Sequence, residues 1–442
     1  MSDTRNLIAD YYDRLPAAIA RCVGDPEPDS TPARFSPGFA LPELDDPVRR
    51  FYDVADATWR ELGEHRGHRL SMLDLTANPA TNTTKTIASL LIVARAVDYV
   101  RRTGEQLLIF SPTSANKGVA LRDALARAIE TELVTPDQLR VVTLAPRTAL
   151  GKFRASRLST DPDLCRRNPV LTYDGPRAEH VKTLGRAFVD RHAAKLAEVG
   201  TRTWFTLELH NYRFADAARA FFEHEVAPAN TPRWHAHAVS SAFGLLGYAT
   251  GLDVLGDVPR PGYLLVQHLG TPDMVLSLRH GDFDRARVPA YVLDPATGLH
   301  RQDRDAHFPE AAHDPAEILD QTFYTREPAT SPEMNGLIER CGGDGIVVSL
   351  HECLTRYARL RAWLEPAGVH LPADPRLVRE WSLVMALTGV LNAIDRGLVP
   401  ADRDVVVHGS GFYAATDYEP IGADAVVPVA TVDDIAAAIV AD

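Results

Sequence analysis

The chain has 442 residues, 45% of them hydrophobic and 24% charged, with a formal net charge of −12. This length allows two or three domains, and an acidic chain without a long basic run makes nucleic acid and anionic membranes unexpected partners. The early apolar segments are short and interrupted by charges, so neither a signal peptide nor a transmembrane helix is expected, and four scattered cysteines without a CxxC pair fit a cytoplasmic protein with free thiols.

Residues 1–69 are predicted to form an N-terminal helical extension. Helical patterning over residues 7–23 is followed by a Pro- and Asp-rich loop over 24–32, and a second helix is expected over 47–62. The segment contains no recognisable catalytic motif. We therefore expect it to serve packing or contact between subunits.

A polar loop over residues 78–84 leads to Lys85, between a predicted strand over 73–76 and a predicted helix over 86–102. A lysine in the first turn of a helix is unusual, because the helix dipole disfavours an ammonium group there. A helix start favours the neutral amine, which is a nucleophile able to form a Schiff base. The alternative is an ordinary surface lysine that happens to follow a loop.

Strands and helices alternate along most of the remaining chain. Predicted strands cover 106–110, 138–144, 203–209, 235–239, 263–267, 345–349 and 405–407. Such alternation indicates an α/β protein with a mostly parallel sheet covered by helices on both faces. Residues 280–330 are rich in Asp, Pro, Arg and His and show little periodicity, so they are predicted to be an insertion.

Polar loops follow several of these strands, and seven segments stand in a recognisable order. They are Asn78-Pro79 with Lys85, Thr113-Ser114-Ala115-Asn116-Lys117-Gly118, Asn211-Tyr212-Arg213, 239–244, Val266-Gln267, Ser331-Pro332-Glu333 with 347–349, and His408-Gly409-Ser410-Gly411. Together they resemble the fold-type II pyridoxal phosphate (PLP) enzymes, and within these threonine synthase and its relative cysteate synthase. The resemblance covers roughly residues 70–435.

This resemblance implies a fold of the tryptophan synthase β type, with two three-layer αβα domains and mostly parallel sheets. The small domain would span residues 80–203 and carry Lys85 and the Asn116 loop. The large PLP-binding domain would comprise residues 70–79 and 204–442, including the insertion. The resemblance also implies a homodimer.

The same resemblance assigns roles to the first two loops. Lys85 would form the Schiff base with PLP and later carry protons at the substrate Cα. Asn116 would hydrogen-bond the 3′ oxygen of the cofactor ring, although an asparagine before such a turn can also be purely structural. The substrate would be bound by side chains of these loops, namely Thr84, Thr113, Ser114 and Lys117.

The cofactor phosphate would bind to Ser240, Ser241, Ala242, Phe243 and Gly244. Backbone N–H groups and the dipole of the following helix could hold a phosphate there. The family is glycine-rich in this loop, whereas this chain has two serines and a phenylalanine. The alternative is an ordinary connection between a strand and a helix.

Two residues compete for the pyridine nitrogen of PLP. His408 stands where threonine synthase has a threonine, but the usual partner in the family is a hydroxyl, so we predict Ser410. A neutral hydroxyl keeps the ring nitrogen largely unprotonated, which favours elimination and replacement over transamination. An imidazole would instead make the ring electronics depend on pH.

Two further histidines, His235 and His237, would share one face of a strand. They could be half of a metal site, but the spacing suggests no third ligand, and we expect them to be structural. No metal is predicted.

The predicted function is a PLP-dependent β- or γ-replacement or elimination on a small amino acid, which could be O-phosphorylated or O-acylated. The departures from the family pattern suggest specialised amino-acid biosynthesis. The alternatives are a dehydratase or racemase on the same scaffold, and a non-catalytic binding protein that keeps the PLP fold.

Overall fold

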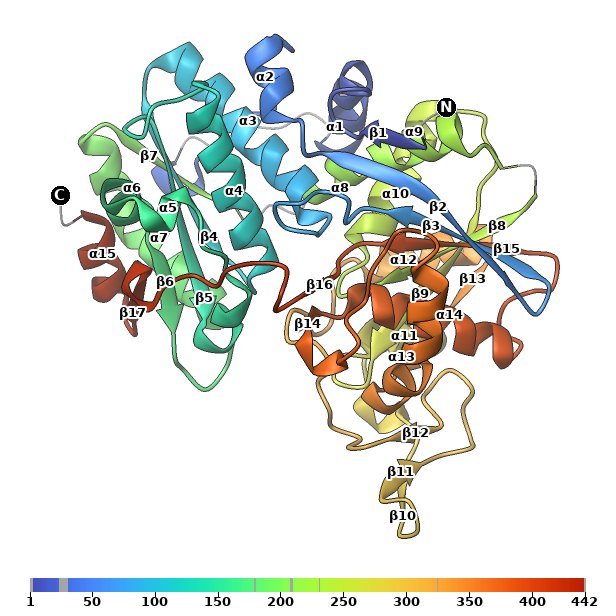
Figure 1. Cartoon of the computed structure of the whole chain (residues 1–442). Coiled ribbons are helices and arrows are strands. Elements are labelled where there is room, and N and C mark those ends of the chain that lie inside the picture. Colours follow the sequence, from blue (N-terminus) through green and yellow to red (C-terminus); the bar gives the residue numbers. More distant parts are fainter. Residues whose placement is uncertain are drawn as a thin grey trace. The chain divides into compact units, whose positions relative to one another are not determined.

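The computed structural model describes residues 3–23, 31–178, 180–206, 210–229, 231–323 and 325–440. The chain divides into two compact units, which are coloured along the sequence in Figure 1. Unit 1 comprises Met1–Arg5, Asp56–Ala77 and Asp216–Thr416. Unit 2 comprises Asn6–Ala55, Asn78–Ala215 and Asp417–Asp442.

Unit 1 is built on a seven-stranded sheet among the described residues, with the order β1-β2-β3-β15-β8-β9-β13. The strands are β1 (Thr4–Asn6), β2 (Asp56–His65), β3 (His68–Asp74), β8 (Arg233–Ala238), β9 (Gly262–His268), β13 (Gly343–Val348) and β15 (Asp404–Gly409). The pairs β3–β15, β15–β8, β8–β9 and β9–β13 are parallel, and β2 runs antiparallel to β3. Parallel strands end at one edge of the sheet, which brings the loops after β8 and β15 close to each other.

Helices cover both faces of this sheet, because alternate residues of each strand point to opposite sides. On β9, Leu264 and Val266 pack into the core formed with α13 and α14, whereas Tyr263 and Leu265 pack into the core formed with α10, α11 and α12. The helices of unit 1 are α9 (Ala218–Val226), α10 (Phe243–Leu255), α11 (Asp273–His280), α12 (Ser331–Cys341), α13 (Leu350–Leu364) and α14 (Ser382–Asp395). A small two-stranded sheet pairs β14 (Val378–Glu380) with β16 (Tyr413–Ala414).

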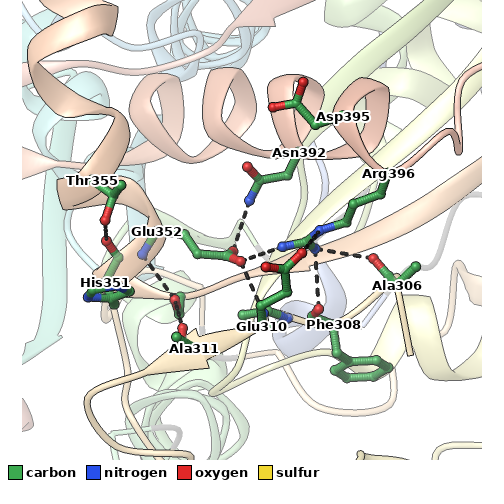
Figure 2. A network of polar contacts seen from close by, with 12 residues as sticks. Ala306, Phe308, Glu310, Ala311, His351, Glu352, Thr355, Asn392, Asp395 and Arg396 are labelled. Atoms are coloured by element: carbon green, nitrogen blue, oxygen red, sulfur yellow. Dashed lines mark hydrogen bonds and ion pairs between the residues drawn. The ribbon is translucent and has the colours of Figure 1, made fainter. Parts of the chain in front are cut away.

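The predicted insertion contains a small antiparallel sheet of β10 (Val292–Asp294), β11 (Leu299–Arg301) and β12 (Ala311–Ala312). Figure 2 shows how the insertion is fastened to α13 and α14. Arg396 donates to the carbonyls of Ala306 and Phe308 at 3.1 and 3.2 Å and pairs with Glu352, which also accepts from the Glu310 amide at 3.2 Å. The Arg396–Glu352 pair is largely buried, so this charge-assisted contact and the bonds around it anchor the insertion to α13 and to the end of α14.

Unit 2 has a five-stranded sheet in its described residues, with the order β17-β6-β5-β4-β7 and every pair parallel. Its strands are β4 (Gln106–Pro112), β5 (Leu139–Pro146), β6 (Val170–Tyr173), β7 (Thr201–Phe205) and β17 (Val426–Val429). Its helices are α1 (Leu15–Val23), α2 (Asp46–Phe51), α3 (Lys85–Thr103), α4 (Asn116–Glu130), α5 (Arg157–Thr160), α6 (Pro162–Arg167), α7 (His180–Glu198), α8 (His210–Asp216) and α15 (Val432–Val440). Helices α7 and α15 share one core with alternate residues of β4, β5 and β6.

The α/β class with mostly parallel sheets is confirmed. No helix in the described part of the chain is long and apolar enough to cross a membrane.

The N-terminal region differs from its prediction. The helix expected over 47–62 is wrong beyond Phe51, because residues 56–65 form β2, in which Ala57 and Trp59 are buried between more exposed neighbours. This alternation has the period of a strand and pairs β2 with β3. Residues 1–69 are therefore divided between the two units and do not form an extension of their own.

Two further predictions reach residues outside the described ranges. The loop predicted over 24–32 falls mostly on such residues. The strand predicted over 203–209 corresponds to β7, which ends at Phe205, and its last three residues lie outside the described part of the chain.

Candidate functional site

The Lys85 loop of unit 2 is organised by one buried side chain, that of Asn78. Its Oδ1 accepts hydrogen bonds from the Thr81 amide and hydroxyl at 3.2 and 2.9 Å, from the Asn82 amide at 3.0 Å and from the Thr86 hydroxyl at 2.9 Å. Its Nδ2 donates to the Thr83 carbonyl at 3.1 Å. Because Asn78 is fully buried, these bonds fix the loop in one conformation just before α3 begins at Lys85.

Arg154 holds the same loop from its other side. Its guanidinium donates to the carbonyls of Ala80 and Thr81 at 2.7 and 2.8 Å and to Asn82 Oδ1 at 3.2 Å, and it lies 4.9 Å from the ring centroid of Tyr418. Asn82 has a φ of 54°, a left-handed conformation that asparagine tolerates better than most residues. Sequence reasoning missed Arg154, since neither its position nor its neighbours form a motif.

The Lys85 amine lies above an aromatic ring. Its Nζ is 4.6 Å from the ring centroid of Tyr212, which belongs to α8. The Nζ of Lys117 lies 5.9 Å from the same ring and donates to the Thr206 carbonyl. Unit 2 therefore brings the predicted catalytic lysine and the predicted substrate-binding lysine to one tyrosine.

The predicted Asn116 loop turns sharply where β4 passes into α4. The buried Thr113 hydroxyl accepts from the amides of Ala115 and Gly118 at 3.1 and 3.0 Å. Ala115 has a φ of 121°, a strained value for a residue with a Cβ atom. A Cβ at Gly118 would lie 2.7 Å from Thr113 Cγ2, so glycine is required there. Ser114 and Asn116 are half-buried on this loop, and Asn116 is the first residue of α4.

In unit 1, the segment predicted to bind phosphate leads directly into α10. The helix begins at Phe243, and Ala242 before it has a φ of 50°. The Thr330 hydroxyl donates to the Ser241 carbonyl at 2.7 Å, and the Thr325 amide donates to the Ser240 hydroxyl at 3.4 Å. The start of a helix offers backbone N–H donors and the positive end of its dipole, so this segment has the donor chemistry that a phosphate requires.

Behind this segment lies a buried chain of polar side chains. Arg219 Nη2 pairs with Asp216 at 2.6 Å, and Arg219 Nη1 lies 3.1 Å from His408 Nδ1. His408 Nε2 lies 2.9 Å from His235 Nδ1, and His235 Nε2 lies 3.4 Å from Glu223 Oε2. Gly244 is packed against this chain, since a Cβ there would lie 2.6 Å from Arg219 Nη1.

The surroundings shift the pKa values of these groups. Burial, with the nearby His235, Arg219 and His237, holds the pKa of His408 well below its usual range. Burial raises the pKa of Glu223, but its contacts with His235, Tyr248 and Arg233 outweigh burial and bring the pKa to about 2. The chain therefore holds His408 neutral and Glu223 ionised.

His408 and Ser410, the two candidates for contact with the ring nitrogen of PLP, differ in the hydrogen bonds that they make within the protein. Both ring nitrogens of His408 are engaged inside the protein, by Arg219 and His235. The Ser410 side chain is 8% exposed, and its hydroxyl makes no hydrogen bond within the described residues. Ser410 is thus the one of the two that keeps a donor for a ligand.

The structure therefore assembles the predicted residues into two groups, one in each unit. Unit 2 holds Lys85 and Thr84 with the Asn116 loop, and unit 1 holds the Ser240–Gly244 segment with His408 and Ser410. His235 belongs to the buried chain, where it contacts His408 and Glu223. Sequence reasoning missed Arg219 and Glu223, whose partners are far away in the chain.

Comparison with known proteins identifies both a family and a fold. The chain belongs to DUF6002, a family of unknown function, whose model matches residues 3–442. No curated protein sequence matches it. Threonine synthase from yeast is similar over 95% of this chain and 81% of that chain, with a TM-score of 0.54 and 14% identity. PLP-bound threonine synthase from Brucella melitensis is similar over 90% of this chain and 78% of that chain, with a TM-score of 0.50 and 13% identity.

These similarities show that the chain has the fold of the fold-type II PLP enzymes, as the order of its loops predicted. At this level of identity the comparison establishes the fold alone. The roles of Lys85 and of the other candidate residues stay predictions.

Proposed function

We propose that this member of the DUF6002 family binds PLP through Lys85 and acts on a small amino acid by replacement or elimination at Cβ or Cγ. The observation that carries the proposal is the placement of Lys85 on a threonine synthase fold. Its amine stands at the start of α3, behind a loop fixed by Asn78, and above the Tyr212 ring.

The residues present fit the cofactor in each unit. Unit 2 supplies an amine for the aldehyde carbon, and Asn116 at the start of α4 for the 3′ oxygen. Unit 1 supplies helix-start donors and the Ser240 and Ser241 side chains for the phosphate, and the Ser410 hydroxyl for the ring nitrogen. Bound PLP withdraws electrons from the substrate Cα and so weakens the bonds around it.

Lys85 is proposed to hold and move protons as well as to bind the cofactor. A lysine amine positioned beside the substrate Cα can remove a proton there and return one later. The contact with Tyr212 restricts the path of the Lys85 side chain. This restriction supports a role that requires the amine at one defined place.

The substrate is proposed to bind at Thr84, Ser114 and the Thr113 turn. The Thr113 hydroxyl oxygen accepts from two amides, so Thr113 shapes the turn from which Ser114 and the first amides of α4 are presented. A helix start of this kind suits a carboxylate. Lys117 is buried and donates to Thr206, so we assign it mainly to holding this loop, with its charge available near the site.

The proposed class of reaction depends on which side chain contacts the ring nitrogen of PLP. With both His408 nitrogens engaged, the Ser410 hydroxyl is the proposed partner, and a neutral partner disfavours transamination. An O-phosphorylated or O-acylated amino acid, a cytoplasmic location and a homodimer remain part of the proposal, supported by the threonine synthase fold.

Absorbance spectroscopy tests the proposal. The purified chain mixed with PLP should develop a visible band that changes on addition of an O-phospho or O-acyl amino acid. Lys85→Ala should stay folded and lose the band, while Lys195→Ala, at an exposed position of α7, should keep it. A wild-type chain that develops no band with PLP would overturn the proposal in favour of a non-catalytic role.

A further inference from the structure

The buried polar chain of unit 1 links two strands and a helix through side chains alone. Arg219 and Glu223 come from α9, His408 from the end of β15, and His235 from β8. Their side chains are almost completely excluded from solvent. Inside a protein, hydrogen bonds of this kind are strong, and a mismatched donor or acceptor is costly.

The direction of each hydrogen bond follows from Arg219. A guanidinium can only donate, so His408 Nδ1 must be an acceptor without a hydrogen. A neutral His408 then carries its hydrogen on Nε2 and donates it to His235 Nδ1. His235 in turn carries its hydrogen on Nε2, which faces the Glu223 carboxylate. Both hydrogen bonds of His408 are satisfied when its imidazole is neutral.

A second proton on His408 has no place in this arrangement. It would lie on Nδ1 and face Arg219 Nη1 at 3.1 Å, donor against donor and cation against cation. The other groups around His408 are no better as acceptors for that proton. His235 and His237 face it from β8, the Tyr248 ring lies 5.5 Å from it on α10, and Asp216 is bound on the far side of the guanidinium.

We propose that Arg219 is a positioning residue that locks His408 as the neutral imidazole with its hydrogen on Nε2, so that the end of β15 offers a bound ring only the Ser410 hydroxyl. The consequence for a cofactor rests on the proposed function, whereas the tautomer itself does not. The partner of the ring nitrogen then stays neutral throughout the physiological pH range, and the ring electronics do not follow pH.

The arrangement also explains how a buried arginine is tolerated. Asp216 accepts from Nη2 at 2.6 Å and balances the guanidinium charge, while Nη1 faces the imidazole of His408. Arg219 thus acts on His408 without being a ligand-binding group. Burial lowers the pKa of Arg219, with Asp216 acting in the opposite direction, and the side chain remains a cation.

The test is nitrogen NMR of the chain labelled at its histidines, recorded without cofactor. His408 is assigned as the signal missing from His408→Gln. We expect its Nδ1 to show the shift of an unprotonated acceptor, its Nε2 that of an N–H, and no change from about pH 5.5 to pH 8.5 around the usual histidine pKa. A wild-type His408 that carries hydrogen on Nδ1, or that titrates in this range, would overturn the proposal.

Two variants test the part played by Arg219. The double variant Asp216→Asn with Arg219→Gln removes both charges of the buried pair and leaves neutral polar side chains. We expect it to give His408 a mixed or reversed tautomer, while Arg219→Lys, which keeps a cationic donor, should retain the wild-type tautomer. An unchanged tautomer in the double variant would assign the lock to another group. The wild-type spectrum decides the tautomer even if a variant fails to fold.

Measurements on the PLP-loaded chain separate the proposal about the His408 tautomer from the proposed function. In the PLP-loaded wild-type chain, the visible band should keep its position over the same pH range. A chain that binds no PLP but shows the predicted tautomer would refute the proposed function and leave the lock intact. A loaded chain whose band titrates together with His408 would refute the lock and leave PLP binding intact.

Discussion

The Lys85 loop of unit 2 and the His408 chain of unit 1 are both dense networks of polar groups, but they are built over different distances in the sequence. The Asn78 side chain forms hydrogen bonds to Thr81, Asn82, Thr83 and Thr86, which lie within eight residues of it. The His408 chain joins residues 173 and 189 positions apart. The first network can form as soon as its loop closes, whereas the second exists only after the sheet has assembled.

This difference suggests a division of roles. A local network can shape the loop that leads to the reactive amine, with Arg154 and Tyr212 adding contacts from farther along the chain. A long-range network joins the end of a strand to helices on one face of the sheet. It forms only in the folded unit, where it can fix the state of a side chain such as His408. Substitutions in each network test this division.

Glu223→Gln should be the most damaging single change to the long-range network. It removes the carboxylate that Arg233 Nη1 contacts at 2.7 Å and that Tyr248 donates to at 2.7 Å. Loss of one partner of a buried pair should lower the free energy of unfolding by about 3 kcal/mol near neutral pH. Urea unfolding of both proteins measures the difference.

The pH dependence of that difference has a defined sign. The pKa of Glu223 in the folded state, about 2, lies below its ordinary value, so its stabilisation is present above the unfolded pKa and is lost as the pH falls through the folded one. The difference in the free energy of unfolding between wild type and Glu223→Gln should therefore become smaller as the pH is lowered from about 5 towards 2. A constant gap would mean that Glu223 is not held ionised.

Asn78→Ala should be the most damaging change to the local network. It leaves a buried Thr83 carbonyl and several donors without their partner, which should cost about 2 kcal/mol. Arg147→Ala, which breaks the exposed ion pair with Asp174, serves as control and should cost less than about 0.5 kcal/mol. Equal effects of the two changes, measured by urea unfolding, would contradict the account of the loop.

The sequence alone could predict more about the local network than about the long-range one. The loop order predicted the α/β fold, and the polar loop before Lys85 predicted a structured start to a helix. The bonds of Asn78 lie within one loop, where residue types and spacing carry the information. The chain through Arg219, His408 and Glu223 could not be predicted, because a single sequence contains no signal for which distant polar residues meet.

Two predictions, one near the N-terminus and one at β15, show what a single sequence does not indicate. Residues 56–62 were expected to continue a helix because their charged positions hide the strand period, which becomes visible only when β2 pairs with β3. The choice between His408 and Ser410 was left to family position and chemistry. The partners that engage both His408 nitrogens come from α9 and β8, outside the turn itself.

Ser241→Asp tests the proposed phosphate segment. A carboxylate beside a bound phosphate in a partly buried place should weaken PLP binding at least tenfold, roughly 1.4 kcal/mol. Ser241→Ala removes the hydroxyl without adding a charge and should change the affinity much less. The dissociation constants come from absorbance titration, and an unchanged affinity in Ser241→Asp would place the phosphate elsewhere.

Ala115→Gly should have the smallest effect, and a stabilising one. With a φ of 121° at this position, glycine relieves strain that alanine must bear, worth about 1 kcal/mol. Ala120→Gly within α4 is the matched control and should destabilise by about 1 kcal/mol, because the backbone there is helical. Destabilisation by Ala115→Gly would show that the turn is not strained.

The central claim is that Lys85 is the residue that binds the cofactor. Borohydride reduction of the PLP-loaded chain, followed by proteolysis and mass spectrometry of the peptides, tests it most directly, because reduction makes the lysine–cofactor bond permanent. We expect the added mass on the peptide that contains Lys85. The mass on Lys117 or Lys152, or on no lysine at all, would contradict it.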